Sequence, residues 1–407
     1  MAWSDLPVDL LGSISSHLPI VDFLRFSAVC TSWNSALAIN SLIRIQCRPS
    51  PWLLLPNNAG EPSDTLTFRD LTIKDSRSSH HRFSSLSENI SGRCCIGSKD
   101  GWLVTVDIKD LQPRLFNPIT RAEISLPSLL TIPGTNEHLI KPEYAPDDSI
   151  DSCINGSNSY VTAYQKLLDV YFRKIVLSSN NSSGTAVVIY RHKKSLALAR
   201  PGDRAWVLGP LLPTYRGEYY NDEFDDIYYN EEEQMFYVIT HFSAMLAFDH
   251  NGQNAKLICP LMQEPYFDDS YHRNYIVCLF GTLIKIEMSY FYFRDVNNNI
   301  CPPKSININV FKFESTGVAS SCSNFQWIPI KDLKDCSLFV GGNQTFSIHH
   351  TIAPEIRPNC IYFSDHWEDF DHDAGVFDLP NDCFEYLLNS YSTTNLPSST
   401  WFTPSFS

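Results

Sequence analysis

The chain has 407 residues, of which 43% are hydrophobic, and its formal net charge at pH 7 is −14. This length and hydrophobic content provide for two or three domains with buried cores, which excludes a disordered chain. A strongly acidic protein repels phosphate backbones and anionic membrane surfaces, so we expect neither nucleic acid nor a membrane as a direct partner.

The cysteines and the N-terminus indicate the compartment. The 12 cysteines include no Cys-x-x-Cys pair and no disulfide framework, which is typical of a reducing environment. The N-terminus shows no signal sequence or targeting presequence, and no apolar run approaches the length that spans a bilayer. We therefore expect the protein in the cytoplasm, the nucleus or both.

Three short amphipathic helices are predicted within residues 3–41. Pro7 suits the first turn of a helix, Pro19 ends that helix near residue 18, and Asp22 can cap the next one. Apolar residues recur at helical spacing in three sets: Leu11, Ile14 and Leu18; Phe23, Leu24 and Phe26; Val29, Trp33 and Leu37. Such helices either pack as ordinary core on the rest of the chain or dock a partner, and three are too few to enclose a core of their own.

The order of residues in these helices favours docking. Leu-Pro-x-Asp-Leu-Leu-x-x-Ile-x-x-x-Leu-Pro at 6–19, with Val-Cys-x-x-Trp at 29–33, resembles the F-box. That resemblance implies binding to the Skp adaptor and, through it, to the Cullin of a ubiquitin ligase. Transferred by position, it places these residues in the adaptor interface or the small core behind it: Leu6, Pro7, Leu10, Leu11, Ile14, Leu18, Leu24, Val29, Cys30 and Trp33.

A proline-containing linker is predicted at 42–51, and a β-rich domain at 52–390, followed by a C-terminal tail at 391–407. Short apolar runs separated by Gly, Asn, Asp and Pro are typical of an all-β sandwich, barrel or propeller. About 340 residues of this pattern exceed one sandwich or barrel, which favours a propeller of six or seven divergent four-stranded blades. The predicted fold is thus multidomain, with a small three-helix domain before an all-β propeller.

Several blocks in this β-rich part are similar to signature blocks of KIB-type plant F-box proteins, whose C-terminal domain is related to kelch-like propellers. The blocks are Pro-Trp-Leu-Leu-Leu-Pro at 51–56, Asp-Gly-Trp-Leu at 100–103, Leu-Phe-Asn-Pro-Ile-Thr-Arg at 115–121, Asn-Cys-Ile-Tyr-Phe-Ser-Asp at 359–365 and Gly-Val-Phe-Asp-Leu at 375–379. The resemblance implies that the propeller captures a protein substrate, and it does not identify that substrate.

An acidic and aromatic segment is the candidate substrate surface. Carboxylates at 222–226 and 231–233 flank a tyrosine pair, and aromatic side chains are favoured at protein interfaces. A run of charges is most often a solvated face, but on a propeller rim it can select a basic partner. The candidate residues are Tyr219, Tyr220, Asp225, Asp226 and Tyr228.

No metal, cofactor or catalytic residue is expected. The dense acidic and histidine group at 365–373 follows neither EF-hand nor zinc spacing, and His80-His81 and His349-His350 are expected at turns or on the surface. No nucleophile elbow, P-loop or dinucleotide fingerprint is present.

The sequence therefore predicts a substrate-recognition subunit of a Skp–Cullin–F-box ubiquitin ligase, without catalytic activity of its own. Two alternatives remain open: an interaction protein whose F-box binds the adaptor without directing ubiquitination, and a propeller-type enzyme.

Overall fold

The computed structural model describes residues 6–15, 17–39, 51–55, 65–73, 79–83, 93–106, 110–135, 172–179, 184–190, 195–211, 222–260, 270–291, 293–294, 300–301, 306–315, 325–364, 374–387 and 399–406. The predicted linker at 42–51 lies outside these residues except for Pro51. No helix in this part of the chain is long and apolar enough to cross a membrane.

Three helices form the N-terminal domain: α1 (Val8–Ser15), α2 (Ile20–Ser27) and α3 (Thr31–Ile39). The Pro7 carbonyl accepts the Leu11 amide at 3.1 Å, which starts α1 where the proline predicts it. Pro19 occupies the N-cap of α2, so Asp22 does not cap that helix. Asp22 instead lies in the first turn, where it pairs with Arg25 at 2.9 Å.

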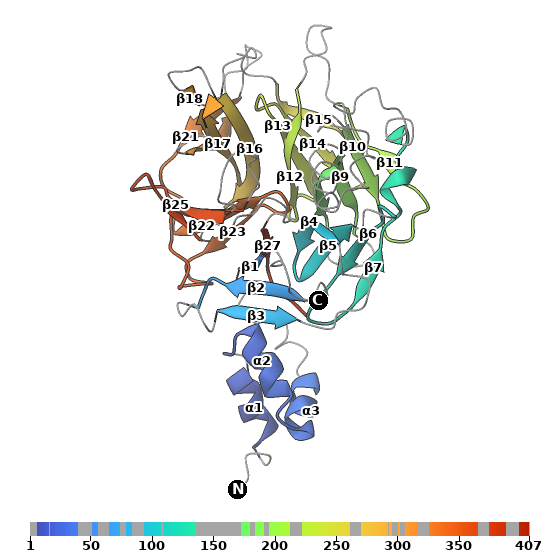
Figure 1. Cartoon of the computed structure of the whole chain (residues 1–407), viewed down its shortest axis with the longest axis vertical. Coiled ribbons are helices and arrows are strands. Elements are labelled where there is room, and N and C mark those ends of the chain that lie inside the picture. The colour runs from blue at the N-terminus through green and yellow to red at the C-terminus, as the bar shows by residue number, and fades with distance from the viewer. Residues whose placement is uncertain are drawn as a thin grey trace.

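The β-rich part is a propeller of six blades, because the described strands form six sheets of four or five strands that follow one another around a ring (Figure 1). Blade 1 contains β27 (Thr400–Phe402), β1 (Trp52–Leu55), β2 (Leu66–Asp70) and β3 (His80–Phe83). Blade 2 contains β4 (Cys94–Lys99), β5 (Trp102–Val106), β6 (Pro113–Phe116) and β7 (Glu123–Ser125), followed by the 3-10 turn η2 (Leu129–Thr131). Blade 3 contains β8 (Phe172–Leu177), β9 (Ala186–Tyr190), β10 (Ser195–Ala199) and β11 (Val207–Leu208).

The second half of the ring repeats this plan. Blade 4 contains β12 (Phe224–Asn230), β13 (Met235–Thr240), β14 (Met245–Asp249) and β15 (Lys256–Cys259). Blade 5 contains β16 (Ser270–Leu279), β17 (Thr282–Phe291), β20 (Asn307–Ser315) and β21 (Phe325–Pro329), with the small hairpin of β18 (Phe293–Arg294) and β19 (Ile300–Cys301) inserted. Blade 6 contains β23 (Phe346–His349), β22 (Cys336–Gly341), β24 (Cys360–Ser364), β25 (Ala374–Asp378) and β26 (Cys383–Tyr386).

The ring is closed by its two ends. β27, near the C-terminus, pairs antiparallel with β1, near the start of the propeller, with Leu53 opposite Trp401. Residues 400–402 therefore belong to blade 1 and not to a separate tail, which corrects the predicted boundary at 390. The innermost strands β27, β4, β8, β12, β16 and β23 contact one another in turn around the axis.

Tight turns join the innermost strand to the second strand in blades 2 and 5. Asp100 and Gly101 have φ values of 43° and 89°, and Phe280 and Gly281 have 49° and 73°. Two successive residues with positive φ give the type I′ turn, whose twist matches that of a hairpin. The Gly-Trp-Leu and Gly-Thr-Leu segments thus continue into β5 and β17.

Several outer strands escape sequence prediction because they are short and exposed. β7 and β26 lie at sheet edges and carry mainly exposed residues, so their sequences show no buried face. The sequence predicts a loop in place of β3, with His81 at the surface. His81 is instead buried, 8% exposed, packs against the Trp52 ring and lies 3.4 Å from Asp70, so the predicted surface position is wrong.

Hydrophobic clusters lie between neighbouring blades. One joins blades 5 and 6 and includes Ile286 and Leu338, and another joins blades 2 and 3 and includes Val104 and Ile175. Each blade therefore buries both faces, as in other sheets that are covered on two sides.

Candidate functional site

The helix α1 carries exposed apolar side chains, in a helical domain that projects from blade 1 of the propeller (Figure 1). Leu10 is 52% exposed and Ile14 is 44% exposed, and both lie on the same helix face as the exposed Pro7, at positions i+3 and i+7. We call these three residues the α1 ridge. An apolar ridge of this kind on a soluble protein indicates a surface that another molecule covers.

The remaining predicted adaptor residues lie at and behind this ridge. Val29 is 59% exposed in the turn between α2 and α3, whereas Leu11 is completely buried. The Trp33 ring packs against the Phe26 ring at a tilt, with centroids 4.2 Å apart, which holds α3 against α2. The other members are partly buried: Leu6, Leu18, Leu24 and Cys30. The structure thus divides the predicted set into exposed contact residues and supporting residues.

The opposite side of the helical domain is fixed to the propeller. Ile20 and Phe23 of α2 are 3% and 2% exposed, and Ile20 packs in one cluster with Trp52 of β1. The Phe23 ring lies 5.3 Å from the ring of Phe406, which follows β27. The helices therefore complete their core on blade 1 and leave the α1 ridge free.

A buried ion pair lies close to the propeller axis. Lys174 of β8, 1% exposed, donates to the Asp226 carboxylate of β12, which is fully buried. The Asp226 carboxylate also accepts the Ile276 amide of β16 at 2.9 Å and the Thr345 hydroxyl beside β23 at 2.8 Å. Burial raises the pKa of Asp226, and the Lys174 ammonium opposes this shift. One carboxylate therefore connects blades 3, 4, 5 and 6.

A second polar group completes the inner ring. The Asn343 amide donates to the Ser98 hydroxyl of β4 and to the Trp401 carbonyl of β27, both at 2.8 Å. These bonds connect blade 6 to blades 1 and 2. The axis is thus built from satisfied polar contacts between blades, which fix their relative positions.

Above this network the channel opens into a cavity of about 510 Å³. Its floor is formed by Ser98, Asn343 and Thr345, which are at most 6% exposed. Its rim is formed by residues in the turns of three blades, of which Glu231, Glu232 and Phe280 are exposed while Lys99 and Asp100 are partly buried. We call this rim, with the cavity, the channel mouth, and its rim residues are Lys99, Asp100, Glu231, Glu232 and Phe280.

A second cavity of about 560 Å³ adjoins the first and extends between blades 2, 3 and 4. The two share Lys99, Asp100, Tyr229 and Glu231, so they lie side by side. Two adjoining cavities offer room for more than one side chain of an extended segment.

The predicted substrate residues are separated by the fold. Tyr228 lines the channel mouth, and burial, with Cys278 and Glu231 nearby, raises the pKa of its hydroxyl to about 12, so it stays protonated. Asp225 and Asp226 are 4% and 0% exposed, so the prediction that they contact a substrate surface is wrong. Both lie on an innermost strand whose two faces are covered by neighbouring blades. Tyr219 and Tyr220 lie outside the described residues.

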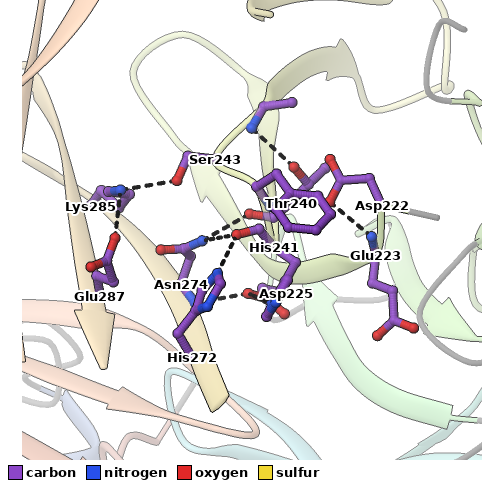
Figure 2. Close-up of polar contacts among 12 residues, drawn as sticks. Asp222, Glu223, Asp225, Thr240, His241, Ser243, His272, Asn274, Lys285 and Glu287 are labelled. Carbon is purple, nitrogen blue, oxygen red and sulfur yellow. Dashed lines mark hydrogen bonds and ion pairs between the residues drawn. The ribbon is translucent and has the colours of Figure 1, made fainter. Parts of the chain in front are cut away.

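Asp225 serves the junction between blades 4 and 5 (Figure 2). A β-bulge between Phe224 and Asp226 directs the Asp225 carboxylate toward β16. There it accepts a hydrogen bond from the backbone N–H of Asn274 at 2.9 Å. The rings of His241 and His272 stack beside it, 3.7 Å apart. This junction lies at the amino-terminal ends of β12 and β16, whereas the channel mouth lies at their carboxyl-terminal ends.

Within the described residues, no group of three or more His, Cys, Asp or Glu side chains could hold a metal ion. The acidic and histidine group at 365–373 lies outside those residues.

Sequence reasoning missed Lys99, Phe280 and Gln344 of the cavity lining, because each comes from a different blade and no local pattern connects them. Glu231 and Glu232 belong to the acidic run at 231–233, but only the β12–β13 turn places them over the channel.

Comparison with known proteins agrees with this architecture. The F-box domain model matches residues 3–44, and the KIB1-4 beta-propeller model matches residues 70–378. F-box protein At3g56470 of Arabidopsis thaliana is 34% identical over 31% of this chain and 30% of its own length. F-box protein SKIP23 of Arabidopsis thaliana is 24% identical over 98% of this chain and 95% of its own length.

Among solved structures, the beta-propeller domain of Cps50 (Swd1) from Myceliophteria thermophila covers 83% of this chain and 89% of that chain, with a TM-score of 0.33 at 7% identity. With its helical F-box at the N-terminus and its family-specific propeller over most of the remaining length, the chain belongs to the plant F-box proteins that carry a KIB1-4 beta-propeller.

Proposed function

We propose that this chain is the substrate-recognition subunit of a Skp–Cullin–F-box ubiquitin ligase, with the α1 ridge binding the Skp-type adaptor and the channel mouth binding a protein substrate. The observation that carries the proposal is the ridge itself: Leu10 and Ile14 stay exposed although the helices have a buried side against blade 1. The chain contributes proximity, holding a substrate near the ubiquitin carrier, and performs no bond chemistry itself.

The rigid connection between helices and propeller supports this role. Phe23 packs on Phe406, which follows the strand that closes the ring. The Ser405 carbonyl accepts a hydrogen bond from the Asn117 side chain of blade 2 at 3.0 Å. A substrate at the channel mouth would therefore sit at a fixed distance from a bound adaptor, which is what efficient transfer to a substrate lysine requires.

The test is binding of a purified Skp-type adaptor to Leu10→Asp and Ile14→Asp variants of the full chain. Each substitution should weaken adaptor binding by about 2 kcal/mol or more, because it places a carboxylate in a desolvated contact. Leu11 is unsuitable for this purpose, since it is fully buried and its replacement would unfold the helices themselves. The matched control is Leu211→Asp, which changes an apolar residue that is 76% exposed on the propeller.

Adaptor binding that is unchanged in both ridge variants would contradict the proposal. An equal loss of adaptor binding in Leu211→Asp would show that the ridge variants lose binding because of general misfolding, which would contradict a specific role of the ridge. An adaptor complex that binds Cullin but leaves co-purifying partners unmodified in a reconstituted ubiquitination reaction would favour the alternative, an interaction protein without a ubiquitination role.

We also propose that the protein works in the cytoplasm or nucleus. Several cysteines are free thiols, among them the buried Cys259, Cys336 and Cys360, as expected in a reducing compartment. Fluorescence of a tagged full chain checks this proposal, and accumulation in the secretory pathway would contradict it.

A further inference from the structure

The channel mouth has an excess of negative charge. Its lining includes the carboxylates of Asp100, Glu231 and Glu232 against one ammonium, that of Lys99. Glu231 and Glu232 are exposed, so their charges face the solvent above the cavity. The floor of neutral amide and hydroxyl groups adds no positive charge, because the Lys174 ammonium below is already held by Asp226.

The protein's own lysines show that this surface accommodates ammonium groups. Lys99 Nζ lies 2.6 Å from the Glu231 carboxylate and 5.9 Å from the centroid of the Tyr229 ring. Lys334 Nζ lies 5.7 Å from the centroid of the Phe280 ring. Carboxylate and aromatic face together are the surroundings that stabilise a cation.

The position of Phe280 on the rim requires a strained backbone conformation. Its side chain is 60% exposed, and its φ of 49° is a conformation that bulky residues rarely adopt and that Asn or Gly would adopt without strain. The ring is held by His349, at 6.1 Å between ring centroids, and by Lys334, but most of it faces the solvent. An exposed aromatic side chain in a strained turn beside a cavity is the feature expected of a ligand contact.

We infer that the channel mouth recognises a segment of substrate protein that carries lysine or arginine side chains, with the cationic group seated between the Phe280 ring and the carboxylates of Glu231 and Glu232. This inference rests on the proposed function and specifies the chemical class of its substrate. An acidic or phosphorylated segment would meet carboxylates on the rim and would be rejected.

The second cavity favours a peptide over a free cation. It lies beside the first, and its lining includes Ser178 and His250 as well as the shared Tyr229 and Glu231. A segment with a cationic side chain in the first cavity therefore meets further polar groups in the second.

The experiment uses the full chain bound to its Skp-type adaptor and fluorescently labelled peptides of Gly and Ser. The peptides differ only in two central positions, which are lysine, arginine, norleucine or glutamate. Fluorescence anisotropy should show that the lysine and arginine peptides bind at least about tenfold more tightly than the norleucine peptide, with weaker binding when the salt concentration is raised. The glutamate peptide should bind most weakly.

Variants then locate the contact. Binding of the lysine peptide should be about tenfold weaker in the double variant Glu231→Gln/Glu232→Gln, and also in the variant Phe280→Asn. Phe280→Asn also relieves the strained turn, so its thermal stability should equal or exceed that of the wild type. The control Glu123→Gln removes one charge from the exposed outer strand β7 and should leave peptide binding unchanged.

Equal binding of lysine and norleucine peptides overturns the inference, as does wild-type affinity in the rim variants. Absence of any peptide binding up to about 1 mM, in a preparation that still binds the adaptor, also overturns it and leaves the proposed function intact. Failure of the wild-type chain to bind the adaptor contradicts the proposed function instead.

Discussion

The α1 ridge and the channel mouth are opposite kinds of surface. The ridge exposes Leu10 and Ile14 on a short helix, whereas the channel mouth exposes carboxylates and one aromatic ring over a polar floor. Exposed apolar surface is unfavourable in water unless a partner covers it, and a polar surface can remain solvated. The difference agrees with the two proposed roles, a lasting contact at the ridge and a reversible one at the channel mouth.

The two surfaces also differ in what holds them in place. The channel mouth rests on a ring of six blades whose inner strands are joined by Lys174, Asp226 and Asn343. The ridge rests on three short helices that obtain part of their buried core from blade 1. Damage to the axis should therefore affect the whole propeller, and damage at the junction should affect the helices alone.

The largest expected effect is at the axis. Lys174→Ala leaves the fully buried Asp226 carboxylate without its cation, and breaking a buried pair in this way costs about 3–5 kcal/mol. We expect a lower denaturant midpoint for the propeller, measured by tryptophan fluorescence. Lys312→Ala, which removes a partly exposed pair with Glu314, should shift the midpoint by less than about 1 kcal/mol. Similar shifts for the two variants would show that the axial pair does not hold the ring.

A smaller effect is expected at the junction. Phe23→Ala removes a ring that is 2% exposed and packs on Phe406, and loss of a buried phenylalanine costs about 3 kcal/mol. Because the helices pack against blade 1 through this ring, hydrogen exchange of the α2 backbone amides should become faster. Exchange of the amides in the inner strands should stay unchanged. The exposed Ile14→Ala serves as control. Unaltered exchange in α2 would mean that the helices are stable without the propeller.

The smallest effect concerns pH. Burial opposes ionisation of Asp70, but hydrogen bonds from His81 and Thr72 outweigh it and hold the pKa of that carboxyl below its ordinary value. A lowered native pKa stabilises the fold above the unfolded pKa of about 4, and this stabilisation is lost as pH falls below that value. Asp70→Asn should therefore cost about 1 kcal/mol near neutral pH, and the difference from wild type should shrink below pH about 4. A difference that is independent of pH would exclude an ionised Asp70 as its cause.

Prediction from sequence succeeds where the signal is local. The helices follow from Pro7 and Pro19 and from apolar spacing, and the order of those residues is sufficient to identify the F-box. The inner and middle strands follow from continuous apolar runs such as Trp102–Val106, since both of their faces are buried. The outer strands β7 and β26 show no such run because they lie at exposed edges.

Tertiary structure alone decided which charges are buried. Asp225, Asp226, Glu231 and Glu232 lie within eight residues of one another, yet the first two are inside the ring and the last two are over the channel. Composition cannot separate them, because burial depends on Lys174 and Asn274 from neighbouring blades. The blade number and the closure by β27 are decided in the same way, since they depend on pairing between strands at opposite ends of the propeller, and a sequence pattern describes only near neighbours.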